Sequence, residues 1–138
     1  MKKSVVMIVI FILCFSMTGC RSRDNVIKRI NADYFTITYG NSFYNARDKV
    51  KQETVDFLVE DYNKIKLVGT TNQELNYDKA ITIIFINNEQ ISAQVTIDDK
   101  GICWIDANNI NTYIIDKESN IYSDLLKVYN EVQEKYES

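Results

Sequence analysis

Residues 80–98 read AITIIFINNEQISAQVTID, two apolar segments joined by a polar loop. Residues 80–86 are apolar on both faces, which is typical of a strand in the interior of a sheet. Residues 91–98 alternate, which is the pattern of a half-buried strand. Their side chains would point inward at Ile91, Ala93, Val95 and Ile97 and outward at Ser92, Gln94, Thr96 and Asp98. The loop at 87–90 holds two asparagines, which tolerate the left-handed backbone of tight turns, so the stretch predicts an antiparallel hairpin.

The flanking segments predict further strands and two helices. Strands are expected at 34–39, 102–105 and 112–116, with a short one at 66–68 that ends at Gly69. One amphipathic helix would start between 48 and 52 and run to about Ile65. A final helix would span about 120–136 with Ser119 as its N-cap.

This order of elements predicts an α+β fold. We expect a mainly antiparallel sheet of about five strands, with two helices packed on one face. Residues 33–138 would form this single domain, which is long enough to bury an ordinary core.

The N-terminus has the organisation of a targeting segment. Lys2 and Lys3 precede an unbroken apolar run, Val5–Phe15, whose length suits a signal peptide and is too short to cross a bilayer comfortably. The run is followed by Ser16 and then by Met17, Thr18, Gly19 and Cys20.

This arrangement resembles the lipobox signal peptide of bacterial lipoproteins, although Met17 stands where that family usually has leucine. The resemblance implies that Met17, Thr18 and Gly19 are recognised by the signal peptidase and that residues 1–19 are removed. It implies that Cys20 carries the lipid, including palmitate, that holds the protein on the outer face of the cell membrane. The rest of the chain is similar in its pattern to small, uncharacterised Gram-positive lipoproteins of unknown function, which names no functional residue.

Residues 20–32 would be the lipidated cysteine and a linker. The linker is locally basic, with Arg21, Arg23, Lys28 and Arg29 against Asp24. It would either touch lipid headgroups or serve only as a solvated spacer.

The composition excludes several kinds of chemistry. The chain has no histidine, which removes the commonest general base and metal ligand. Its net charge of −3 argues against a nucleic-acid partner. Cys103 lies in a predicted strand and is interpreted as a small core residue, because no histidine could activate it. We therefore expect no enzyme activity, no metal site and no cofactor.

Aromatic side chains are the remaining candidates for contact with a partner. Phe57 lies off the apolar arc of its helix; it would either anchor a partner or be covered by residues near Phe43 and Tyr44. Tyr122, Tyr129 and Tyr136 recur every seven residues and share one helix face, which would be either an interface or an edge of the core.

Two functional hypotheses follow. The first is a membrane-anchored binding module on the cell surface, whose partner is an envelope protein or a peptide. The alternative is a small-ligand or peptide receptor or sensor accessory, including an immunity- or inhibitor-type role, which would need an enclosed apolar pocket.

Overall fold

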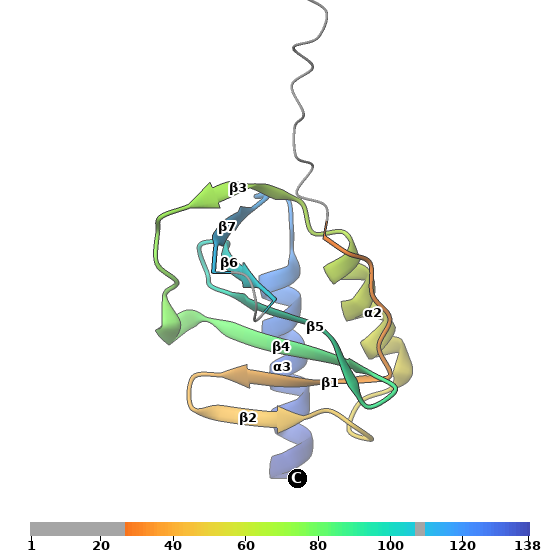
Figure 1. Ribbon diagram of the computed structural model, residues 1–138. Helices are drawn as coiled ribbons and strands as arrows, with labels where there is room; N and C mark the ends of the chain where they lie inside the picture. The colour runs from red at the N-terminus through yellow and green to blue at the C-terminus, as the bar shows by residue number, and fades with distance from the viewer. Residues whose placement is uncertain (1–26, 107–109) are drawn as a thin grey trace, which may run out of the picture.

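The predicted hairpin forms the middle of a seven-stranded antiparallel sheet (Figure 1). The structure is a computed structural model that describes residues 27–106 and 110–138. Its elements follow the order β1 (Tyr34–Tyr39), β2 (Ser42–Asn45), α2 (Gln52–Asn63), β3 (Leu67–Thr71), the 3₁₀ turn η2 (Tyr77–Lys79), β4 (Ile81–Asn87), β5 (Gln90–Ile97), β6 (Ile102–Ile105), β7 (Thr112–Ile115) and α3 (Ile121–Glu137). The α+β class is confirmed.

The sheet has more strands than the sequence suggested. Its order is β2-β1-β4-β5-β6-β7-β3, seven strands in place of about five. β2 lies in a segment for which no strand was predicted, and β3 continues through Gly69 to Thr71. Both are edge strands whose partners, β1 and β7, supply the ladder, so short segments with little periodicity of their own become strands.

Both helices cover the same face of the sheet (Figure 1). Tyr62 of α2 packs edge-on against Phe85 of β4, and Tyr129 of α3 packs against Tyr39 of β1. The last helix buries five side chains along one face: Ile121, Leu125, Val128, Tyr129 and Val132. The two helices run in opposite directions, so the C-terminal end of α2 lies beside the N-terminal end of α3 (Figure 1).

The β4–β5 turn corrects the expected direction of one side chain. Asn88 and Glu89 have positive φ values of 48° and 62°, as a tight hairpin turn of the I′ kind requires. A register shift after Phe85 then places Ile91 opposite Ile86, whereas Ala93 pairs with Phe85. Ile91 was expected to face inward, but the bulge turns it outward and leaves it 68% exposed.

Asp98 is a second correction, because it was expected to face outward and is fully buried. Its Oδ1 accepts hydrogen bonds from the backbone N–H groups of Lys100 and Ile102, at 3.0 and 2.9 Å. Its Oδ2 accepts one from the N–H of Asn76, at 3.0 Å. The carboxylate thus closes the β5–β6 turn and fixes the loop before η2 to it.

The folded unit extends into the predicted linker. Ile27 and Ile30 are each 8% exposed and belong to the core cluster. The side-chain amide of Asn63, the last residue of α2, accepts from the Ile30 N–H at 2.9 Å and donates to the Ile30 carbonyl at 3.1 Å. These contacts tie the segment that leads into β1 to the end of α2.

Across residues 27–106 and 110–138, none of the helices has the length and apolar character needed to span a membrane.

Candidate functional site

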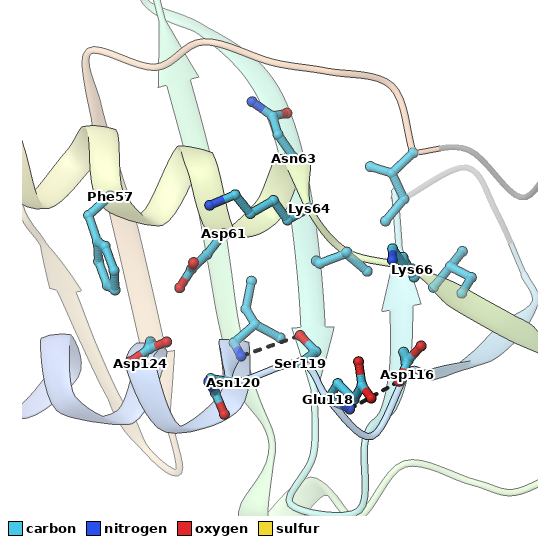
Figure 2. Close-up of a pocket in the computed structure, with 14 residues that line it drawn as sticks. Phe57, Asp61, Asn63, Lys64, Lys66, Asp116, Glu118, Ser119, Asn120 and Asp124 are labelled. Carbon is cyan, nitrogen blue, oxygen red and sulfur yellow. Dashed lines mark hydrogen bonds between the residues drawn. The ribbon is translucent and has the colours of Figure 1, made fainter.

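A groove of about 850 Å³ lies on the described surface between the C-terminal end of α2 and the N-terminal end of α3 (Figure 2). It is lined by Ile27, Phe57, Asp61, Asn63, Lys64, Ile65, Lys66, Leu67, Asp116, Glu118, Ser119, Asn120, Ile121 and Asp124. The two helices and the segments that follow α2 and precede α3 therefore build it together. Its volume is in the range of sites that hold small ligands or short peptide segments.

Phe57 forms part of the apolar wall of the groove and is 44% exposed. The sequence predicted an exposed position for this residue, or a cover formed by residues near Phe43 and Tyr44. Phe43 lies on the edge strand β2, where it pairs with Thr38 of β1, and it is itself 62% exposed. Tyr44 packs against the rings of Tyr129 and Tyr136 instead. Phe57 thus remains available on the groove wall.

A pair of carboxyl groups lies beside Phe57. Asp61 on α2 points toward Asp124 on α3 (Figure 2). Burial, followed by the neighbouring Asp124 carboxyl, raises the pKa of Asp61 to about 6. Asp61 also lies in the last turn of α2, where the helix dipole disfavours a negative charge.

The charge of Asp61 is only weakly compensated, because Lys64 favours its ionisation while burial and Asp124 oppose it more strongly. The Oδ2 of Asp61 is shielded from water and has no hydrogen bond within the described part of the chain. The ammonium group of Lys64 is hydrogen-bonded to Glu60, which lies outside the groove lining. The pair could therefore accept a cationic group, which would satisfy Asp61, or it could exchange a proton near neutral pH.

The sequence did not reveal this pair. Asp61 and Asp124 belong to different helices, and neither sits in a recognisable motif.

Ser119, predicted as the N-cap of the last helix, lies one residue before the cap position, which is occupied by Asn120. The Ser119 hydroxyl is 3.5 Å from the Ile121 N–H, a long hydrogen bond at the rim of the groove.

The three tyrosines of α3 face the sheet. Tyr129 is 5% exposed, with ring centroids 5.4 Å from Tyr39 and 5.5 Å from Tyr44. The Tyr122 hydroxyl donates to the carbonyl of Lys79 at 2.8 Å. The Tyr136 hydroxyl donates to the carbonyl of Asn45 at 2.6 Å, while its ring stays 45% exposed. The hydroxyl groups of Tyr122 and Tyr136 thus link α3 to η2 and to β2. This arrangement is the one expected if the tyrosine face is an edge of the core.

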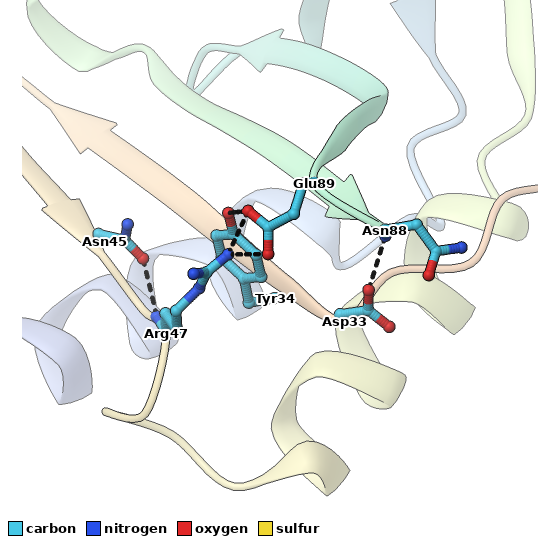
Figure 3. A network of polar contacts seen from close by, with 6 residues as sticks. All are labelled: Asp33, Tyr34, Asn45, Arg47, Asn88 and Glu89. Carbon is cyan, nitrogen blue, oxygen red and sulfur yellow. Dashed lines mark hydrogen bonds and ion pairs between the residues drawn. The ribbon is translucent and has the colours of Figure 1, made fainter.

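A second, smaller hollow of about 330 Å³ lies where the segment after β2 meets the β4–β5 turn. Arg47 forms an ion pair with Glu89, and its guanidinium carbon lies 4.0 Å from the centre of the Tyr34 ring (Figure 3). Asp33 accepts a hydrogen bond from the Asn88 N–H at 2.7 Å. Because Arg47 and Glu89 already satisfy each other, this network is better suited to holding the hairpin turn than to binding a ligand.

The remaining predicted positions are placed as follows. Met17, Thr18, Gly19 and Cys20 lie outside the described residues. Cys103 is fully buried, and burial raises the pKa of its thiol to about 12, so the thiolate is not formed at physiological pH. Within residues 27–106 and 110–138, no cluster of three or more His, Cys, Asp or Glu side chains could hold a metal ion.

No protein-family model matches this chain, and no curated protein or solved structure matches it either.

Proposed function

We propose that this protein is a lipoprotein held on the outer face of the cell membrane through Cys20, and that the groove between α2 and α3 is its binding site. The anchor is supported by the lipobox-like order of Lys2, Lys3, the apolar run Val5–Phe15 and Cys20. The binding role rests on one observation: a groove of about 850 Å³ in which the exposed ring of Phe57 lies beside the carboxyl pair of Asp61 and Asp124 (Figure 2).

The anchor and the groove would lie close together. Ile27 lines the groove, and the Ile30–Asn63 hydrogen bonds fix the chain there. Seven residue steps separate Cys20 from Ile27, which limits their separation to about 25 Å even for a fully extended chain. An anchored protein would therefore hold the groove within reach of the membrane surface.

The receptor or sensor alternative, including an immunity- or inhibitor-type role, uses the same groove differently. A small-ligand receptor would enclose its ligand in a mainly apolar pocket. Here Phe57 is 44% exposed and carboxyl and ammonium groups share the lining with apolar side chains. These features favour a groove that contacts part of a larger partner.

Acid–base catalysis is the other use open to a pair of carboxyl groups. The described lining offers a single hydroxyl side chain, Ser119, which is engaged with the Ile121 N–H. No base is hydrogen-bonded to it that could activate it as a nucleophile in the described part of the chain. We therefore favour binding over catalysis.

The anchor is tested by metabolic labelling of cells with a clickable palmitate analogue. We expect the wild-type protein and the Cys14→Ala variant to be labelled, and the Cys20→Ala variant to lose the label and leave the membrane fraction. An unlabelled wild-type protein would contradict the anchor.

The binding role is tested by placing a photo-crosslinking amino acid at position 57 in living cells. The matched control carries it at position 43, which is also exposed but lies on the outermost strand. We expect one envelope protein or peptide to be crosslinked at position 57 and not at position 43. Identical products at both positions would contradict a specific groove.

A further inference from the structure

The charges around the groove define the partner it would accept. Its lining has four carboxyl groups, from Asp61, Asp116, Glu118 and Asp124, and two ammonium groups, from Lys64 and Lys66. The charge of Lys64 is already engaged by Glu60. The groove is therefore acidic, and it would attract a positively charged partner and repel a negative one.

Asp61 supplies a particular position for that positive charge. One of its oxygens is shielded from water without a hydrogen bond among the described residues, and the Asp124 carboxyl faces it (Figure 2). Because Asp61 and Asp124 both line the groove, a donor that enters it can reach the exposed side of this carboxyl pair. An ammonium or guanidinium group at this point would offset the repulsion between the two carboxyl groups and donate charge-assisted hydrogen bonds to them.

The apolar part of the groove requires a second property in the partner. Phe57, Ile65, Leu67 and Ile121 share the lining with the carboxyl groups. Ile65 and Ile121 are already buried by the fold, but Phe57 is 44% exposed and Leu67 is only partly buried. A simple cation would leave the Phe57 ring in contact with water, whereas an apolar side chain would cover it. A partner with both basic and apolar side chains fits both parts of the lining.

We propose that the groove binds a cationic amphipathic peptide, with a lysine or arginine side chain against the Asp61–Asp124 pair and an apolar side chain against Phe57. This identification deepens the proposed binding role of the groove, but it does not depend on the lipid anchor. If the anchor is present, the position is favourable, because peptides of this kind concentrate at membrane surfaces.

The test uses the full chain, purified from membranes and placed in nanodiscs of phosphatidylcholine. The probe is a fluorescein-labelled octapeptide of alternating leucine and lysine, and its matched control has glutamate in place of lysine. Fluorescence anisotropy gives the affinity, with empty nanodiscs to subtract binding to lipid. We expect the Asp61→Asn/Asp124→Asn variant to bind the lysine peptide at least about tenfold more weakly, because charge-assisted hydrogen bonds are lost.

A second double variant controls for the loss of two charges. Asp56→Asn and Glu134→Gln also remove two carboxylates from α2 and α3, but outside the groove. This variant should bind within about twofold of wild type, since exposed charges act weakly at a distance. Phe57→Ser, which leaves the carboxyl pair unchanged, should weaken binding of the lysine peptide as well, and provides an independent reading if the first variant unfolds.

Three results would overturn the proposal. The two double variants would bind the lysine peptide equally, or the glutamate peptide would bind as well as the lysine peptide. The third result is that the Arg21→Ser/Arg23→Ser variant binds the probe about tenfold more tightly than wild type. This result would mean that basic residues of this chain itself occupy the groove. If the wild-type protein were not labelled by the palmitate analogue, this would refute the lipid anchor but would not affect the result on peptide binding.

Discussion

Substitution of Asp61 by asparagine should stabilise the protein at neutral pH. The folded structure raises the pKa of this carboxyl from 3.8 to about 6, so ionising it costs more in the folded than in the unfolded chain. Without solvent screening, such a rise in pKa corresponds to a loss of about 3 kcal/mol in the free energy of unfolding when Asp61 is ionised. Because the carboxyl is only partly shielded, solvent screening reduces the expected effect to about 1 kcal/mol. Asparagine has the same size and removes the charge.

The sign of the pH dependence distinguishes this explanation from a change in packing. Because the pKa of Asp61 is raised, the folded state holds the proton more tightly, and stability decreases as pH rises from about 4 to about 6. The groups that face Asp61 are Asp124 and Glu60, which oppose its ionisation, and Lys64, which favours it. The gain in free energy of unfolding from Asp61→Asn should therefore reach its full value at pH 7.5 and be small at pH 4.

Urea unfolding, monitored by circular dichroism at pH 7.5 and at pH 4, measures the difference in free energy of unfolding between Asp61→Asn and wild type. Asp56→Asn is the matched control, because it removes a carboxyl from the exposed side of the same helix, where it accepts a hydrogen bond from Gln52. Its effect should stay within about 0.5 kcal/mol at both pH values. The reasoning is refuted if Asp61→Asn is no more stable than wild type at pH 7.5, or if its advantage is equal at pH 4.

Three further results are expected. Asp98→Ala should destabilise the fold by about 3 kcal/mol or more in urea unfolding, because a fully buried carboxylate that accepts three backbone hydrogen bonds is lost; an effect below about 1 kcal/mol would contradict this role. Cys103 should react with a chromogenic disulfide reagent only after denaturation, since it is fully buried with a thiol pKa of about 12; rapid reaction of the native protein would show that the strand opens. Tyr136→Phe should cost about 1 kcal/mol in thermal unfolding by removing the hydrogen bond to Asn45 while keeping the ring, and an unchanged stability would show that this bond contributes nothing.

Periodicity explains why much of the fold could be predicted. The hairpin at 80–98 combines a strand that is apolar on both faces with one that alternates, and the last helix has apolar residues at every third and fourth position. Such patterns survive packing because a shift of register would expose the core side chains. The off-arc position of Phe57 left an exposed and a covered side chain as alternatives, and the structure shows a ring that is 44% exposed.

The errors occurred where a neighbouring segment decides the structure. β2 and β3 become strands through β1 and β7, and the bulge that turns Ile91 outward depends on the pairing of β4 with β5. Asp98 has the alternation of an exposed residue, yet its carboxylate is needed by backbone groups that the turn brings to it.

The sequence by itself determined the α+β class, the face of each helix that is buried and the lipobox-like order that motivates the proposed anchor, because these are local patterns along the chain. Only the tertiary structure decided the groove. Asp61 and Asp124 meet because α2 and α3 run in opposite directions on one face of the sheet, and Ile27 joins them because Asn63 holds the chain there (Figures 1 and 2). Charge proximity between distant segments has no periodic signature, and the raised pKa of Asp61 arises only when packing removes water and brings a second carboxyl beside it.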